Sequence, residues 1–145
     1  MAQASVGDIF PCSCEEFFRI VTDYSNYPEF LQEVKKCEVL KEEAHRKLVE
    51  YQVSLMKDFR YQLWMKESSD SKSVSWEFAS GDIFKSMKGS WVLQDEGGKC
   101  RATYSIDAEF GLFVPGPLAK ALVSVNLPNM ISSYHRRVKE LYGRS

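Results

Sequence analysis

The sequence predicts an α+β fold in which a curved antiparallel sheet wraps around one long C-terminal helix. Between residues 48 and 110, apolar and polar residues alternate in successive runs, as in antiparallel strands with one buried face and one solvated face. From residue 118 onward, apolar residues recur at spacings of three and four, as in an amphipathic helix. An open sheet must cover its apolar face, and this helix is the one predicted element long enough to do so.

The N-terminal part predicts a strand followed by two short helices. Residues 2–10 form the expected strand. Ser13 is a suitable N-cap for the first helix, because its side chain can accept from a free N–H and acidic residues follow in the first turn. A second short helix or turn is expected over residues 23–31, where the fixed φ of Pro28 suits a first helical turn.

Five further strands follow from the alternation. In the fourth of them, Gly89 is expected to mark a bend or bulge. In the same strand, the two-residue alternation places Lys85 on the buried face with Met87 and Trp91. The five predicted strands cover residues 48–56, 59–66, 73–78, 83–93 and 101–110.

The C-terminal helix is expected to follow Pro115-Gly116-Pro117 and to carry an apolar stripe from Leu118 to Leu141. Pro128 falls inside this stripe. It lacks an N–H and its ring clashes with the preceding turn, so a kink is expected there.

Length and charge limit the function classes. A chain of 145 residues predicts one domain over residues 1–145. The net charge of −1 makes direct nucleic-acid binding unexpected, because phosphate neutralisation normally requires a basic excess. No apolar run approaches the roughly 20 residues that span a bilayer, and no signal segment begins the sequence. We therefore expect a cytoplasmic protein, while the oligomeric state stays undetermined.

Metal, cofactor and catalytic signals are weak. Cys12, Cys14, Cys37 and Cys100 lack the spacing and nearby histidines of a zinc site, so free thiols are expected, with no metal and no cofactor. Neither histidine falls on a predicted buried face, and none of the common catalytic motifs occurs. Tyrosine hydroxyls are the main polar groups on that face. We assign no catalytic residue, which favours a protein that is not an enzyme.

One segment carries a family resemblance. Val21–Leu31 (VTDYSNYPEFL) is similar to the pattern V-x-D-Y-x-x-Y-P-x-F-(L/V), and Gly89–Leu93 is similar to a G-x-W strand. With Leu127–Met130, these segments resemble the START-like (helix-grip, SRPBCC) superfamily, in its polyketide cyclase/dehydrase and coenzyme Q-binding branch. The resemblance covers essentially the whole chain.

The resemblance implies a helix-grip fold. About seven curved antiparallel strands would wrap around the long C-terminal helix, with two short helices between strands 1 and 2 and an internal cavity for a hydrophobic ligand. Relatives in this superfamily include lipid and quinone carriers, aromatase/cyclases and a bacterial protein reported to block ribosome subunit association.

The preferred hypothesis is therefore binding or transport of a hydrophobic small molecule, such as a lipid, an isoprenoid quinone or a polyketide, without catalysis. A cyclase or dehydratase that uses tyrosines as weak acids is one alternative. A ribosome-associated interaction protein is another, with Arg136 and Arg137 as contact residues, and peripheral membrane contact also stays open.

The apolar and aromatic residues on the predicted buried faces could either line a cavity or fill the space completely as a core. The expected ligand-binding wall consists of Phe30, Tyr51, Val53, Tyr61, Leu63, Trp76, Phe78, Met87, Trp91, Tyr104, Ile106, Leu118, Leu122, Val125, Met130 and Tyr134.

Overall fold

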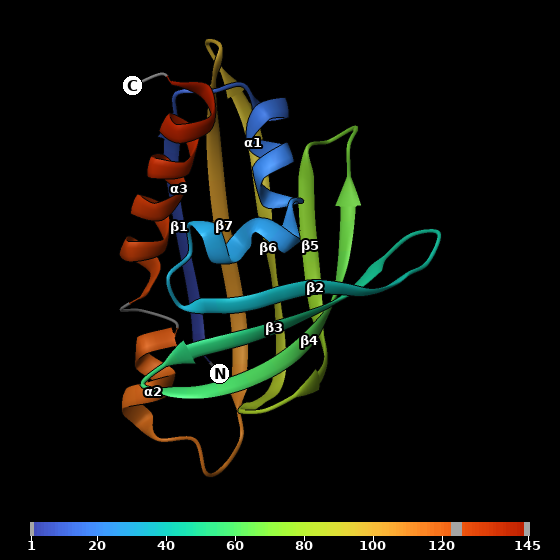
Figure 1. Ribbon diagram of the computed structural model, residues 1–145, viewed down its shortest axis with the longest axis vertical. Helices are drawn as coiled ribbons and strands as arrows, with labels where there is room; N and C mark the ends of the chain where they lie inside the picture. The colour runs from blue at the N-terminus through green and yellow to red at the C-terminus, as the bar shows by residue number, and fades with distance from the viewer. Residues whose placement is uncertain (1, 123–125, 144–145) are drawn as a thin grey trace.

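Seven strands form one antiparallel sheet in the order β1-β7-β6-β5-β4-β3-β2 (Figure 1). The computed structural model describes residues 2–122 and 126–143. The predicted antiparallel sheet and its seven strands are confirmed. The strands are β1 (Ala2–Phe10), β2 (Val34–Glu42), β3 (Lys47–Leu55), β4 (Lys57–Ser68), β5 (Ser73–Gly81), β6 (Phe84–Glu96) and β7 (Lys99–Phe110).

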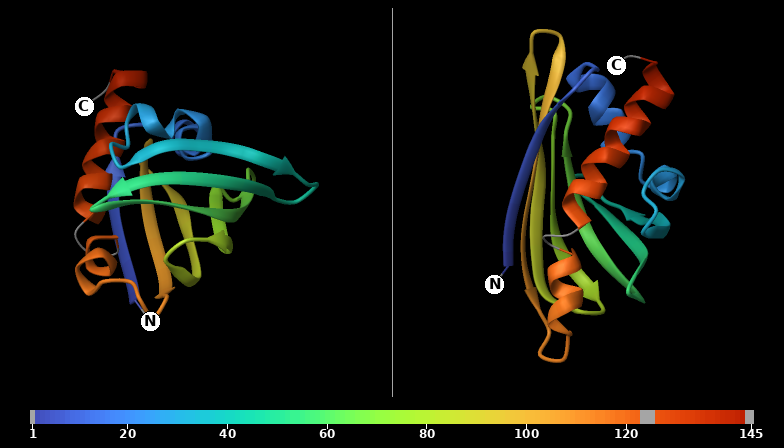
Figure 2. Two further views of the ribbon diagram at one scale, coloured as in Figure 1. Left: turned by 60° about the horizontal axis from the view of Figure 1, so that its bottom comes forward. Right: turned by 90° about the vertical axis from the view of Figure 1, so that its left-hand side faces the viewer.

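The sheet is strongly curved. In Figure 1, β2, β3 and β4 run across the direction of β1, β7 and β6, and Figure 2 shows the helices together on one side of the sheet. Register shifts interrupt the β2–β3, β4–β5 and β6–β7 pairs. Such shifts bend a strand and increase its twist, so they help the sheet to curve around its helices.

Two short helices connect β1 to β2, as predicted. α1 (Cys14–Val21) begins with a capping box: the Ser13 hydroxyl accepts from the Glu16 N–H at 3.0 Å, and the Glu16 carboxylate accepts from the Ser13 N–H at 2.9 Å. The second helix, η1 (Tyr24–Glu29), is a 3-10 helix. Pro28 lies in its second half and not in its first turn, so that detail of the prediction was wrong.

The C-terminal segment contains α2 (Gly116–Lys120) and α3 (Asn126–Tyr142). The kink expected at Pro128 involves the carbonyl of Ser124, and residues 123–125 lie outside the described residues. Leu141 ends the predicted apolar stripe but is 48% exposed. No helix in the described parts of the chain is long and apolar enough to cross a membrane.

Aromatic contacts hold α3 against the sheet and the short helices. The ring of Tyr134 on α3 lies 5.1 Å from that of Trp91 on β6 and 5.6 Å from that of Phe17 on α1. At the sheet edge, His135 stacks on Phe10, and its Nε2 lies 2.8 Å from the Asp8 carboxylate of β1. α3 is therefore anchored both at the centre and at one edge of the sheet.

Gly89 makes room for a side chain and marks no bulge. Its pairing with Trp76 on β5 and Ile106 on β7 is regular, so a bulge at this position was a wrong prediction. A Cβ at this position would lie 2.5 Å from Cζ2 of Trp76 and 2.6 Å from the carbonyl oxygen of Ser105. The indole of Trp76 therefore covers the bare backbone of Gly89.

Gly89→Ala should accordingly destabilise the protein. Because the new methyl group meets an indole and a backbone carbonyl, we expect the free energy of unfolding to fall by about 1–3 kcal/mol. Urea denaturation followed by tryptophan fluorescence measures this change. Gly116→Ala is the matched control, since nothing lies within 4 Å of its added Cβ. Equal stabilities of the two variants would contradict the role given to Gly89.

Candidate functional site

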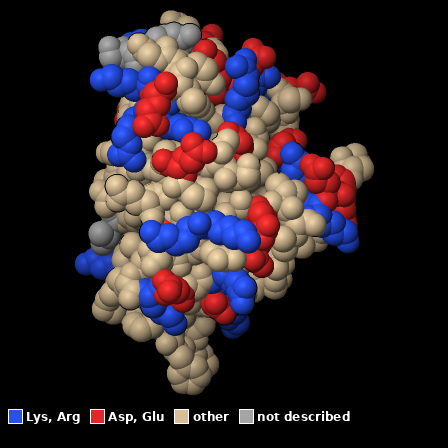
Figure 3. All heavy atoms as spheres, viewed as in Figure 1, with Lys and Arg blue, Asp and Glu red and all other residues tan. Residues whose placement is uncertain are grey.

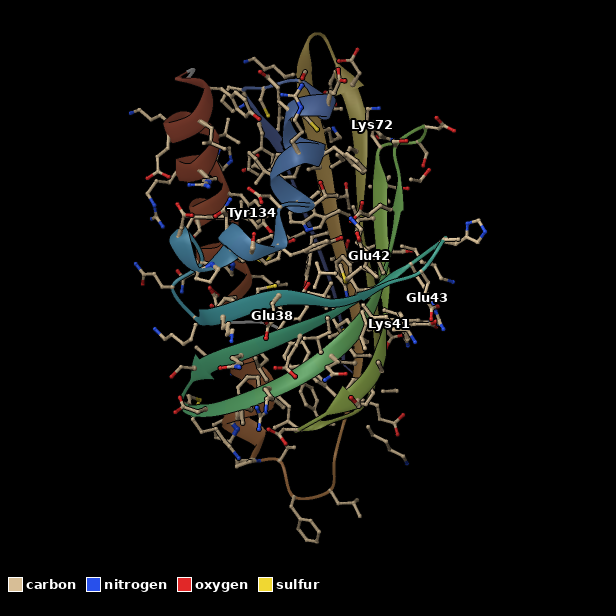
Figure 4. All side chains as sticks on the ribbon, turned by 45° about the vertical axis from the view of Figure 1, so that its right-hand side comes forward. Glu38, Lys41, Glu42, Glu43, Lys72 and Tyr134 are labelled. Atoms are coloured by element: carbon tan, nitrogen blue, oxygen red, sulfur yellow. The ribbon has the colours of Figure 1, made fainter. Side chains whose placement is uncertain are left out.

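A cavity of about 130 Å³ lies between the curved sheet and the C-terminal helical segment. Its wall is mostly apolar and aromatic, which is usual for sites that bind small molecules. Tyr134, labelled in Figure 4, contributes to it from α3. The lining residues are Val21, Tyr27, Leu31, Glu33, Val34, Tyr51, Val53, Tyr61, Met65, Val74, Trp76, Phe84, Met87, Trp91, Tyr104, Ile106, Leu122, Asn126, Leu127, Met130 and Tyr134.

Most of the side chains predicted for the wall line this cavity. They come from β3 to β7, from α3 and from the residues after α2, and alternation along each strand gives the strand residues the same face. The structure brings together Tyr51, Val53, Tyr61, Trp76, Met87, Trp91, Tyr104, Ile106, Leu122, Met130 and Tyr134.

Four predicted wall residues lie elsewhere. Phe30 packs between Tyr134 and the Arg137 guanidinium, which lies 5.2 Å from its ring centroid. Leu63 and Leu118 are buried in the core without reaching the cavity. Phe78 lies next to the register shift between β4 and β5, and packs on Phe84 with a centroid distance of 6.1 Å. Val125 falls outside the described residues.

The same kind of irregularity displaces Lys85. A register shift lies between Phe84 and Ser86, so Phe84 faces the cavity, while the Lys85 side chain is 73% exposed and pairs with Glu109 at 3.3 Å. The prediction that Lys85 shares a face with Met87 was therefore wrong.

Sequence reasoning also missed part of the wall. Met65 and Val74 have the buried-face parity of their strands, so the alternation contained the signal for them. The remaining missed residues lie in helices, connections or shifted positions, where alternation gives no signal. They are Val21, Tyr27, Leu31, Glu33, Val34, Phe84, Asn126 and Leu127.

Tyrosine hydroxyls are several of the polar groups that line the cavity. The Tyr27 hydroxyl donates to the Val21 carbonyl at 2.5 Å, and that of Tyr51 contacts the Met65 sulfur at 3.7 Å. Within residues 2–122 and 126–143, the hydroxyls of Tyr61 and Tyr104 have no hydrogen-bond partner. These two hydroxyls are therefore available to a molecule in the cavity.

Burial raises the pKa of these tyrosines. Desolvation is the largest cause for Tyr61, Tyr104 and Tyr134, and the negative charge of Glu33 raises the pKa of all three further. The hydroxyls therefore stay protonated at neutral pH and act as neutral hydrogen-bonding groups. A raised pKa also makes each of them a weaker proton donor.

Glu33 and Asn126 form the polar edge of the cavity. Glu33 lies between η1 and β2, where its backbone carbonyl accepts from the Ser54 N–H of β3 at 2.8 Å. Its carboxylate Oε2 accepts from the Asn126 side-chain amide at the start of α3, at 2.6 Å. This hydrogen bond closes the wall between α3 and the segment that leads into β2.

The cavity wall does not form an evident acid–base pair. It contains no histidine, and Glu33 is its one carboxylate among the described lining residues. In the described parts of the chain, no three metal-binding side chains cluster together. The arrangement is therefore better suited to holding a molecule than to moving protons on it.

Comparison with known proteins places this cavity in context. The model of the family described as polyketide cyclase / dehydrase and lipid transport matches residues 11–133. The chain belongs to this family. Its fold is that of the START-like, helix-grip proteins.

Individual relatives are distant but cover the whole chain. The ribosome association toxin RatA of Vibrio cholerae is 24% identical over 145 residues, which is 99% of each protein. A START superfamily protein from Mycobacterium smegmatis has a TM-score of 0.84 at 21% identity, covering 96% of this chain and 98% of that one. The Zhui aromatase/cyclase from Streptomyces sp. R1128 has a TM-score of 0.71 at 13% identity, covering 94% and 85%.

The raised tyrosine pKa values predict alkaline instability. Above the ordinary tyrosine pKa of about 10, the unfolded chain loses protons that the folded chain keeps, so stability is complete below that pH and falls above it. Each such tyrosine should contribute up to about 1.4 kcal/mol per pH unit. Urea midpoints at about pH 9 and about pH 11, with tyrosinate absorbance, measure this loss.

Tyr61→Phe isolates one of these groups. At neutral pH the variant should unfold at nearly the same urea concentration, because the hydroxyl has no partner among the described residues. At alkaline pH it should lose less stability than the unchanged protein. The same alkaline loss in both proteins would show that Tyr61 titrates normally in the folded state.

Proposed function

We propose that the protein binds a small hydrophobic molecule in the cavity beneath α3 and acts without catalysis. The observation that carries this proposal is an apolar, aromatic space of about 130 Å³ that the surrounding side chains leave unfilled. An empty cavity costs stability because its lining loses contacts, whereas a fitting ligand restores them. The family description, which names polyketide chemistry and lipid transport, supports a ligand of this class.

The cavity volume limits the size of this ligand. Pockets for drug-sized molecules usually measure about 300–1,000 Å³, whereas an engineered apolar cavity of about 150 Å³ binds benzene. A volume of about 130 Å³ therefore fits one substituted aromatic ring. A lipid, an isoprenoid quinone or a polyketide would enter only partly unless the wall moved. Met87 and Met130 in the wall have flexible side chains that can adapt to a larger guest.

Filling the cavity tests this proposal. Ile106→Phe places a ring in the space, so the affinity for propylbenzene should fall at least about tenfold, equivalent to about 1.4 kcal/mol. Calorimetry measures the affinity, and quenching of tryptophan fluorescence reports binding beside Trp76 and Trp91. Native mass spectrometry of the purified protein, followed by solvent extraction, would identify a ligand carried from the cell.

Val92→Phe is the matched control. Val92 lies on β6, is 44% exposed and does not line the cavity. The affinity of this variant should equal that of the unchanged protein. Equal propylbenzene affinities for both variants, or no binding by the unchanged protein, would reject the cavity as a ligand site.

The whole-length similarity to RatA supports a second candidate, an interaction with ribosomes. The contacts of Arg136 and Arg137 do not favour these residues as the ones that would bind a ribosome. The Arg136 guanidinium donates to the Phe30 carbonyl at 3.0 Å, and the Arg137 side chain is 12% exposed between Glu29 and Glu140. Figure 3 shows acidic and basic side chains intermingled over one face.

Co-sedimentation with ribosomes tests this second candidate directly. A specific complex should pellet with ribosomes at low salt and persist at moderate salt, because the mixed surface charge gives little sequence-independent attraction to RNA phosphates. Addition of propylbenzene to the same samples shows whether cavity occupancy changes the interaction. Protein that stays in the supernatant at every salt concentration rejects the candidate.

A further inference from the structure

We propose that the cavity selects a ligand with a hydroxyl group, such as a phenol, and that Glu33, Tyr61 and Tyr104 bind this group. This inference rests on the proposed function and names its ligand class. The cavity supplies an apolar wall for a ring and a polar edge for a substituent on it.

Glu33 supplies a hydrogen-bond acceptor at the edge of the cavity. It is the one carboxylate among the described lining residues, and it comes from the connection between η1 and β2. One oxygen, Oε2, accepts from Asn126 at 2.6 Å, and no partner of the other oxygen is found in the described chain. A carboxylate oxygen only accepts hydrogen bonds, so the group that binds it must be a donor.

Two tyrosine hydroxyls without partners in the described chain supply hydrogen-bond donors. Tyr61 of β4 and Tyr104 of β7 line the same cavity as Glu33, so the three side chains border one space. Each neutral tyrosine hydroxyl can donate one hydrogen bond. The cavity thus presents an acceptor and two donors to the same guest.

A hydroxyl group matches this set. It donates its proton to Glu33 and accepts from a tyrosine, so it satisfies both kinds of group at once. A hydrocarbon leaves all of them without a partner. A carboxylate ligand could accept from the tyrosines, but its charge would repel that of Glu33. The preferred order is therefore phenol, then hydrocarbon, then carboxylate.

Three matched probes test this order. 4-Propylphenol, propylbenzene and 4-propylbenzoate share one ring and one chain and differ only in the polar group. For the unchanged protein we expect calorimetry to show affinity about tenfold higher for the phenol than for the hydrocarbon, and at least about tenfold lower for the benzoate. Glu33→Leu should remove the advantage of the phenol while propylbenzene still binds.

Further variants separate charge from hydrogen bonding. Glu33→Gln keeps an amide of similar shape that can still accept from Asn126, but it removes the charge, so benzoate binding should rise at least about tenfold. Tyr61→Phe and Tyr104→Phe should each lower the phenol affinity and leave the propylbenzene affinity unchanged. Glu38→Leu is the control on β2 (Figure 4), because Glu38 pairs with Lys36 at 3.5 Å and does not line the cavity.

The outcomes separate this inference from the proposed function. If propylbenzene binds but Glu33→Leu leaves the ratio of phenol to hydrocarbon affinity unchanged, the hydroxyl proposal is wrong and the cavity function stands. If benzoate binds the unchanged protein as well as the phenol does, the proposal is also wrong. If none of the three probes binds, both proposals fail. Thermal unfolding of each variant confirms that the comparison is made between folded proteins.

Discussion

The contact between Tyr134 of α3 and Trp91 of β6 determines how closely the helix approaches the sheet. Both side chains are buried, and their rings meet edge to face at 5.1 Å. Trp91 in turn contacts Tyr104 at 5.1 Å, and Tyr104 contacts Trp76 at 5.5 Å. Aromatic side chains have few rotatable bonds, so these four rings keep α3 at a fixed distance from the sheet, where flexible aliphatic side chains would let it come closer. The strands continue to curve away from α3, and the unfilled space becomes the cavity.

The polar groups inside this space explain why it is unlike an ordinary core. A buried hydroxyl without a partner costs about 1–3 kcal/mol, so folded proteins usually pair such groups. Tyr27 and Tyr51 follow that rule through Val21 and Met65. In the described chain, Tyr61 and Tyr104 do not, although both lie in the cavity wall. Both residues are only partly buried, so a guest in the cavity can supply the partner that the protein does not.

Alternation along the strands was enough to predict the sheet and much of the wall. Parity depends only on the two-residue repeat of a strand, and it placed Tyr51, Tyr61, Trp76 and Tyr104 on the buried face without any knowledge of their neighbours. It failed at the register shifts, because one extra residue moves every following side chain to the other face. Phe84 and Lys85 exchanged their expected positions for that reason.

The rest of the site depends on contacts between segments far apart in the sequence. Glu33 and Asn126 are separated by 93 residues and belong to no alternating run. Their hydrogen bond exists only because the sheet brings the start of β2 next to the start of α3. Such features follow from the completed fold and could not be derived from local patterns.

The hydrogen bond between Glu33 and Asn126 also fixes the polar edge of the cavity. It joins the residue before β2 to the first described residue of α3, so one carboxylate oxygen is occupied within the wall. Hydrogen bonds to a charged group contribute about 1.5–3 kcal/mol, so this pair stabilises the contact between the two segments. No partner of the second oxygen is found in the described chain, so the same carboxylate can hold the wall and still accept from a guest.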